Sequence, residues 1–310
     1  MTSLASIATL LIGLVVIPGA TAATAHPSPA APAALAAPDA AAMPAANRTS
    51  GQRSGRKHKA RCPAFPGADQ FSTTIDTPLM PLAPGTTFTY RETENGGETQ
   101  NDVVNVTSET KTILGVSTVV VHDVASLPDG TPVEDTLDWY AQDRAGNVWY
   151  FGEDTKEFKN GHVVSTKGSW EAGVKGAMPG IVMEADSRVG DVYRQECAHR
   201  QAADVANVLN LSTSVSVPFG SFDHALETEE TSRLDPGVVE RKQYAPCIGF
   251  VRSELVKGGK EVAELVDVQP PPSGSGCGSA VSGKSAAGGG QAIAGDRRAI
   301  QRKSKIRPRP

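Results

Sequence analysis

Two tight-turn signals lie close together in the stretch 136–171, TLDWYAQDRAGNVWYFGEDTKEFKNGHVVSTKGSWE. Arg144-Ala145-Gly146 can form a three-residue loop with glycine in the left-handed conformation, and Asn160-Gly161 is the strongest two-residue hairpin signal. These turns predict three neighbouring antiparallel strands. Because side chains on a strand alternate between faces, the turns also predict which residues lie opposite one another.

The predicted register sorts the side chains of these strands onto two faces. Trp139 lies opposite Phe151, and Phe151 lies opposite Trp170, so these rings form the core face. Glu153 falls on that same core face. We expect the opposite face to meet water or a ligand, and it carries Asp138, Tyr140, Gln142, Tyr150, Ser169 and Glu171.

The remaining chain has a foldable middle between two biased ends. Residues 1–22 join an apolar run to a small-residue cleavage pattern and read as a secretory signal peptide, with no transmembrane segment left after its removal. Residues 23–61 are an Ala/Pro-rich, then basic, disordered linker. Residues 62–272 are the β-rich domain. Residues 273–310 are a Gly/Ser-rich basic disordered tail.

Short alternating or Val/Thr-rich runs continue through the middle of the chain and are separated by turn residues. The segment 201–211 is ambiguous, because its apolar spacing suits either a short helix or a strand. The segment 173–180 is rich in glycine and predicts an irregular loop beside the sheet. The fold class that follows is mainly β, a single antiparallel meander sheet that is curved or a half-barrel, with disordered N- and C-terminal tails.

The charges are divided between the domain and the two ends. Residues 62–272 hold 32 acidic and 16 basic side chains, whereas the ends carry 6 basic with 1 acidic and 8 basic with 1 acidic. An acidic domain argues against nucleic-acid binding by the folded part, since phosphate contacts need clustered Lys and Arg. The basic ends can contact an anionic envelope surface, fold back on the domain, or remain solvated arms.

Four cysteines fit an exported protein. Three pairings are possible, of which Cys197 with Cys247, and Cys62 with Cys277, is favoured because the second bond would tie the two ends of the domain together. The absence of a CxxC motif in the sequence argues against a redox dithiol or a zinc ribbon.

Several segments in order resemble an uncharacterised family of secreted, β-rich bacterial proteins. They are EDTLDWYAQDRAGNVWYFGEDT, GSWEAG, PGIVM, YRQE, VPFGSF and KQYAPCIGFV, and the resemblance covers about residues 76–268. It implies a β fold and export, and it supplies no catalytic residues. Cys197 and Cys247 stand where the family pattern has other residues, which favours an added disulfide.

Catalytic and metal chemistries find little support in the residue pattern. On a flat sheet the backbones of Asp138 and Glu171 are about 11 to 12 Å apart, whereas glycoside hydrolysis needs carboxyl groups within about 5 to 9.5 Å. The sequence holds no GxSxG motif for a serine nucleophile. Oxygen atoms that calcium would accept are present on Asp138, Asp143, Asn147, Glu153 and Asp154, but their spacing matches no calcium loop. Capping of their own loop explains Asp143 and Asn147 better. We therefore expect neither a metal nor a cofactor.

Ligand binding needs the fewest assumptions. The adjacent tyrosines Tyr140 and Tyr150, beside polar groups, predict a stacking surface for a glycan, a peptide or a lipid-like small molecule. The alternative is a secreted polysaccharide-acting hydrolase or lyase that uses acidic and tyrosine residues of the same face. Either way the expected location is extracellular or the periplasm and cell envelope.

Overall fold

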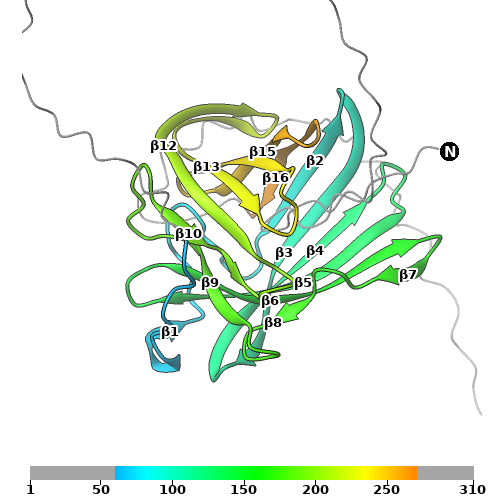
Figure 1. The fold of residues 1–310 in the computed structure, drawn as a ribbon. Coiled ribbons are helices and arrows are strands. Elements are labelled where there is room, and N and C mark those ends of the chain that lie inside the picture. Colours follow the sequence, from blue (N-terminus) through cyan, green and yellow to red (C-terminus); the bar gives the residue numbers. More distant parts are fainter. Residues whose placement is uncertain (1–59, 271–310) are drawn as a thin grey trace, which may run out of the picture.

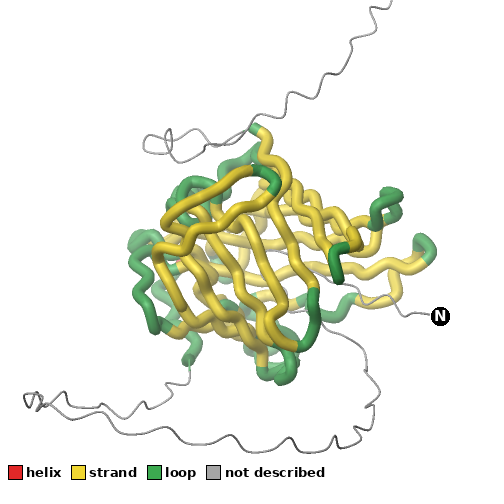
Figure 2. Tube along the Cα trace, turned by 90° about the horizontal axis from the view of Figure 1, so that it is seen from above, coloured by secondary structure: helices red, strands yellow, loops and turns green. Residues whose placement is uncertain are grey.

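The computed structural model describes residues 60–270, and they form strands joined by short turns (Figures 1 and 2). One 3₁₀ helix, η1 (Ala68–Gln70), precedes the sheet, and no α-helix occurs within this range. The first strands are β1 (Phe71–Ser72), β2 (Thr87–Glu94), β3 (Gly97–Ile113), β4 (Val116–Ser126), β5 (Pro132–Asp143), β6 (Val148–Lys159), β7 (His162–Ser165), β8 (Trp170–Glu171) and β9 (Met178–Met183). The later strands are β10 (Val192–Arg194), β11 (Glu196–Cys197), β12 (Asp204–Val217), β13 (Gly220–Ser232), β14 (Val239–Ala245), β15 (Gly249–Lys257) and β16 (Glu261–Gln269). The predicted mainly β fold is confirmed.

The sheet consists of two meanders joined edge to edge. Strands β2 to β6 pair in chain order, and so do β12 to β16. Strand β16 then pairs with β2, where Leu265 lies opposite Tyr90. Beyond β6, β9 and then β11 extend the same antiparallel sheet. The expected single antiparallel sheet is therefore present, with a long-range contact between its first and last strands.

One short segment brings the two ends of this sheet together. Strand β10 pairs with β12 and strand β11 pairs with β9, and only Gln195 separates β10 from β11. The Gln195 backbone N–H donates to the Asp204 carbonyl at 3.0 Å. A Cβ atom at Gly180 would lie 2.3 Å from the Gln195 carbonyl oxygen, so only glycine permits this approach. The sheet is thus strongly curved, as predicted, and encloses an interior (Figure 1).

Both faces of the β5–β6 hairpin are buried. Tyr140 and Tyr150 point into the interior and are 0% exposed. On the outer face, the Phe71 ring packs edge to face against Trp149 at 5.6 Å and against Phe151 at 5.4 Å between ring centroids. The prediction that the tyrosine face meets water is wrong. Curvature turns it inward, and the N-terminal part of the described chain covers the other face.

A β-bulge at Gly152 changes the register halfway along this hairpin. Near the loop Tyr140 lies opposite Tyr150, as predicted, but beyond the bulge Asp138 lies opposite Glu153. Gly152 has a φ of 131°, a conformation that side chains strongly disfavour. Because the bulge inserts one residue into β6, Glu153 shares the inner face with Asp138. Its predicted position on the opposite face is wrong.

The third predicted strand is divided into two short strands. Strands β7 and β8 both pair with β6, and a turn lies between them. Trp170 lies opposite Glu153 and packs edge-on against Tyr150 at 5.4 Å, so it belongs to the inner face. Trp139 lies opposite Val120 on the outer face. The predicted aromatic row is therefore wrong at Trp170, whereas Trp139 and Phe151 do share one face, as predicted.

Two local ambiguities are decided by the structure. The segment 201–211 contributes to a strand, β12, and not to a helix. The Asp143 carboxylate caps its own loop, since Oδ1 accepts the backbone N–H groups of Ala145 and Asn147, each at 2.9 Å. The Trp149 indole N–H donates to the other oxygen of the same carboxylate at 2.8 Å. Loop capping is thus the role of Asp143.

The disulfide pairing differs from the favoured one. Cys62 is bonded to Cys197, which joins the start of the described chain to strand β11. Cys247 is disulfide-bonded as well. Both favoured pairings, Cys197 with Cys247 and Cys62 with Cys277, are wrong, because Cys62 and Cys197 bond to each other. Cys277 itself lies outside the described residues, as do the predicted signal peptide and nearly all of the two basic ends.

Candidate functional site

Three predicted ligand residues, Asp138, Tyr140 and Tyr150, meet inside the sheet. All three are 0% exposed. The rings of Tyr140 and Tyr150 stack with centroids 5.0 Å apart, and the Tyr150 hydroxyl donates to Asp138 Oδ1 at 2.6 Å. Their predicted adjacency is confirmed. Their burial means that any ligand must contact them through a neighbouring group.

Gln142 and Ser169 hold backbone segments in place. Gln142 Oε1 accepts the backbone N–H groups of Asp76 and Thr77 at 3.0 Å each, and its Nε2 donates to Asp76 Oδ1 at 2.7 Å. Ser169 Oγ accepts the Thr155 N–H at 2.9 Å and donates to the Thr155 carbonyl at 3.2 Å. Gln142 thereby fixes the loop before β2, and Ser169 fixes β8 beside β6.

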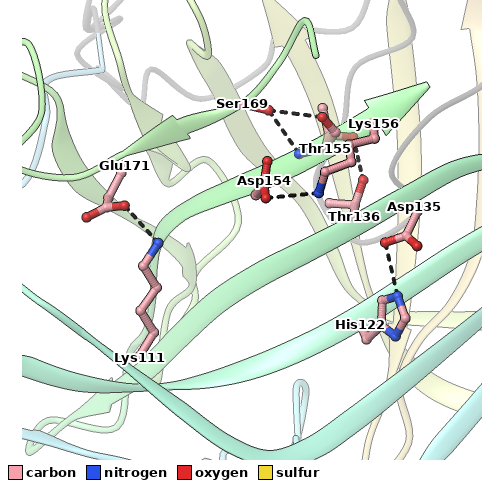
Figure 3. A network of polar contacts seen from close by, with 9 residues as sticks. All are labelled: Lys111, His122, Asp135, Thr136, Asp154, Thr155, Lys156, Ser169 and Glu171. Atoms are coloured by element: carbon pink, nitrogen blue, oxygen red, sulfur yellow. Dashed lines mark hydrogen bonds and ion pairs between the residues drawn. The ribbon is translucent and has the colours of Figure 1, made fainter. Parts of the chain in front are cut away.

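Glu171 lies on the outer face in an arrangement of opposite charges over an aromatic ring. The Lys111 Nζ is 2.8 Å from Glu171 Oε2 (Figure 3). It also lies 3.3 Å from the centroid of the Trp139 ring. The side chains of Lys111 and Glu171 are each 36% exposed. An ammonium over an indole face is held by the ring quadrupole as well as by the carboxylate.

These outer residues belong to a cleft of about 570 Å³. It is lined by parts of β3, β4, β5, β6 and β8, by the loops on either side of β8 and by the turn before β12: Glu109, Thr110, Lys111, Val120, Leu137, Trp139, Glu153, Asp154, Ser169, Trp170, Glu171, Val174, Lys175 and Gln201. Of the six predicted ligand residues, Ser169 and Glu171 line it, whereas the other four do not. The glycine-rich loop predicted over residues 173–180 forms one wall through Val174 and Lys175. The predicted loop is too long, because from Met178 onward the chain belongs to strand β9.

Sequence reasoning missed Lys111 and assigned Trp139 only to the core. Trp139 is 5% exposed, yet it lines the cleft. Lys111 lies on β3, two strands away from β5 in the sheet, and nothing in its local sequence pattern marks it. Only the pairing of β3, β4 and β5 brings Lys111 beside Trp139.

A hydrogen-bonded path leads from the cleft to the interior. Glu153 lines the cleft, and burial, followed by the nearby Asp138 charge, raises its pKa well above the ordinary value, while a hydrogen bond with Tyr150 opposes that rise. Tyr150 in turn donates to Asp138. Burial raises the pKa of Asp138 to about 7, against the lowering effect of the Tyr150 hydrogen bond. Burial therefore favours the protonated form of both carboxyls relative to an exposed carboxyl.

The interior beneath this path is unusually rich in acids. Burial raises the pKa of a group of inward-pointing carboxyls: Glu92, Asp102, Asp123, Asp138, Glu153, Glu196 and Asp204. Lys242, 1% exposed, supplies a buried cation 3.0 Å from Glu230 and 3.4 Å from Glu240. Across the described part of the chain, no three His, Cys, Asp or Glu side chains come together in a way that could hold a metal ion. Burial thus favours the neutral form of these interior acids over the charged form.

Comparisons with known proteins locate the chain only broadly. No protein-family model matches it, and no curated protein matches it. A crystal structure from Bacteroides fragilis, of a protein inferred to be exported and having a YmcC-like fold, is similar with a TM-score of 0.40 and 16% identity, over 63% of this chain and 100% of that one. A protein from Parabacteroides distasonis, inferred to be a lipoprotein, is similar with a TM-score of 0.36 and 14% identity, over 62% of this chain and 99% of that one. Residues 60–270 contain no helix with the length and apolarity of a membrane span.

Proposed function

We propose that this chain is an exported or cell-envelope protein whose β domain binds a glycan in the outer cleft. Export is supported by the predicted signal peptide and by the cysteines of the described range, none of which is free. The basic ends remain candidates for contact with an anionic envelope surface, and the acidic domain remains an unfavourable partner for nucleic acid.

The cleft itself carries the ligand proposal. Trp139 lines the cleft, and charged side chains share the lining with it, among them Lys111 over the Trp139 ring and Glu171 at hydrogen-bonding distance from Lys111. Sugars present apolar C–H faces that stack on aromatic rings and hydroxyls that hydrogen-bond to charged groups. A lipid-like ligand fits less well, because six of the lining residues are charged at their ordinary pKa values.

The test is titration calorimetry of the full chain against soluble oligosaccharides, after a glycan array has selected a binder. We expect Trp139→Leu to weaken binding about five- to thirtyfold, because the aromatic contact is worth about 1 to 2 kcal/mol. Trp149→Leu is the matched control, since Trp149 is also on the outer face and 3% exposed but lies outside the cleft lining. Thermal unfolding of both variants separates lost stability from lost contact.

A second variant probes the cleft without touching the core. Asp154 is 47% exposed and pairs with Lys156 at 3.0 Å (Figure 3). We expect Asp154→Asn to weaken glycan binding several-fold and to leave unfolding unchanged, because exposed pairs contribute about 0 to 1 kcal/mol to stability. Unchanged binding in both Trp139→Leu and Asp154→Asn would remove the cleft from the binding surface.

Glu153 supports a polysaccharide hydrolase or lyase as the second candidate. It lines the cleft, burial raises the pKa of its carboxyl, and Tyr150 connects it to Asp138. A carboxyl whose pKa is raised by burial holds its proton more firmly, which is the character of a general acid. Release of new reducing ends from a bound polysaccharide, abolished in Glu153→Gln, would establish the enzyme. If the wild-type chain binds the polysaccharide and does not cleave it, the enzyme proposal fails and the binding proposal stands.

A further inference from the structure

The position of the Lys111 ammonium shows what the cleft is built to hold. It lies 3.3 Å from the Trp139 ring centroid and 2.8 Å from Glu171 Oε2, so one cation is bound by a ring face and a carboxylate together. We propose that the ligand of the cleft is a glycan that bears free amino groups, and that a ligand ammonium takes this position in place of Lys111. The inference rests on the proposed function and names the ligand class of that site.

Displacement of Lys111 costs little. Its side chain is 36% exposed, and ion pairs at this exposure contribute little to stability because water and salt screen them. The freed Lys111 ammonium is hydrated in solvent. A ligand ammonium recovers the same ring face and carboxylate, while the remainder of the ligand adds contacts that the lysine side chain cannot make.

The charges of the cleft walls also favour a cation. Glu109 and Asp154 add negative charge to that of Glu171, and once Lys111 is displaced, Lys175 is the one basic side chain left in the lining. The cleft therefore has a preference for positive charge.

The experiment compares a glucosamine oligosaccharide with its fully N-acetylated counterpart, at about pH 6, where an ordinary amine is protonated. We expect the free-amine oligosaccharide to bind the full chain more tightly, and its affinity to fall as salt rises from about 0.15 M to 1 M. Glu171→Gln should weaken this binding about fivefold, because it removes the carboxylate that the ammonium contacts, and should leave the N-acetylated form nearly unaffected.

Lys111→Met provides the sharpest readout. It removes the internal ammonium that competes for the site, so affinity for the free-amine oligosaccharide should rise about fivefold, as a cation–π contact of about 1 kcal/mol implies. Lys257→Met, at an exposed position on β15 outside the cleft, is the matched control and should change nothing.

Two failures are distinguishable. Equal or tighter binding of the N-acetylated form, or weaker binding of the free-amine form by Lys111→Met, overturns the amino-glycan inference and leaves glycan binding in place. If neither oligosaccharide binds and the glycan array selects no other binder, the proposed function fails together with the inference.

Discussion

The buried carboxyl of Glu92 allows the acid-rich interior to be tested directly. Glu92 lies on β2, is 1% exposed, and accepts a hydrogen bond from Gln100 Nε2 at 3.1 Å. It also shares a hydrogen bond with Asp102, which requires that one of the two carboxyls be protonated. Burial raises the pKa of Glu92 from 4.5 to about 8, and the nearby charges of Asp123 and Glu240 add to the rise. The folded protein thus keeps a proton that the unfolded chain releases.

The sign of the pH dependence follows from that proton. Because the folded pKa of Glu92 lies above its unfolded value, its contribution favours folding fully below about pH 4.5 and is lost as the pH rises toward 8. The difference between 8 and 4.5 corresponds to about 5 kcal/mol, at about 1.4 kcal/mol for each pH unit. Glu92→Gln keeps the shape of the protonated side chain and removes its titration. The variant should gain stability over the wild type as the pH rises.

The assay is urea unfolding of the wild type and Glu92→Gln at about pH 5, 6, 7 and 8. We expect similar stability at the lowest pH and a growing advantage of the variant, of several kcal/mol, at the highest. Glu94→Gln is the matched control, because Glu94 is exposed at the end of the same strand and its substitution should shift no curve. A constant difference between Glu92→Gln and the wild type across this pH range would refute the neutral-acid interior.

Three further changes test the architecture. Gly152→Ala should destabilise the domain by several kcal/mol in urea unfolding, because its Cβ would fall 2.2 Å from the Trp170 carbonyl oxygen; a loss below about 1 kcal/mol would mean that the bulge can relax. Lys242→Met should cost about 3 to 5 kcal/mol by leaving Glu230 buried without its cation, and adding Glu230→Gln should restore part of it; no restoration would contradict the ion pair. Cys62→Ser opens a disulfide that spans 135 residues and should lower the stability by up to about 5 kcal/mol relative to the oxidised wild type in urea unfolding. Under reducing conditions the wild type loses the same bond, so the difference between the two proteins should vanish; a difference that persists there would show an effect other than loss of the disulfide.

Much of the strand pattern could be predicted from the sequence because its signals are local. The Asn160-Gly161 turn connects β6 to β7, with Lys159 opposite His162, and the Asp143 loop closes as expected, with its N–H bonded to the Asn147 carbonyl at 2.9 Å. Turn residues and alternating side chains act within a few positions of each other. The adjacency of Tyr140 and Tyr150 followed correctly from that same register.

Beyond the bulge at Gly152, the sequence could not predict which face of the sheet each side chain occupies. Sequence alternation gives no sign that Phe151 and Gly152 together occupy one position opposite β5, since glycine inside a strand has several explanations. One inserted residue places Glu153 inside, and the separate pairing of β8 places Trp170 inside as well. The cleft was equally hidden, because Lys111 reaches Trp139 only across β4.

By itself the sequence determined where this chain forms strands and turns, because backbone conformation responds to residues a few positions away. Tertiary structure alone decided which face of each strand is inside, which cysteines pair and which charges meet at Trp139. The physical reason is that these properties depend on sheet curvature and on contacts between strands far apart in sequence, such as β16 with β2 and the segment around Gln195 with both ends of the sheet. No local sequence pattern encodes contacts between strands so far apart in the chain.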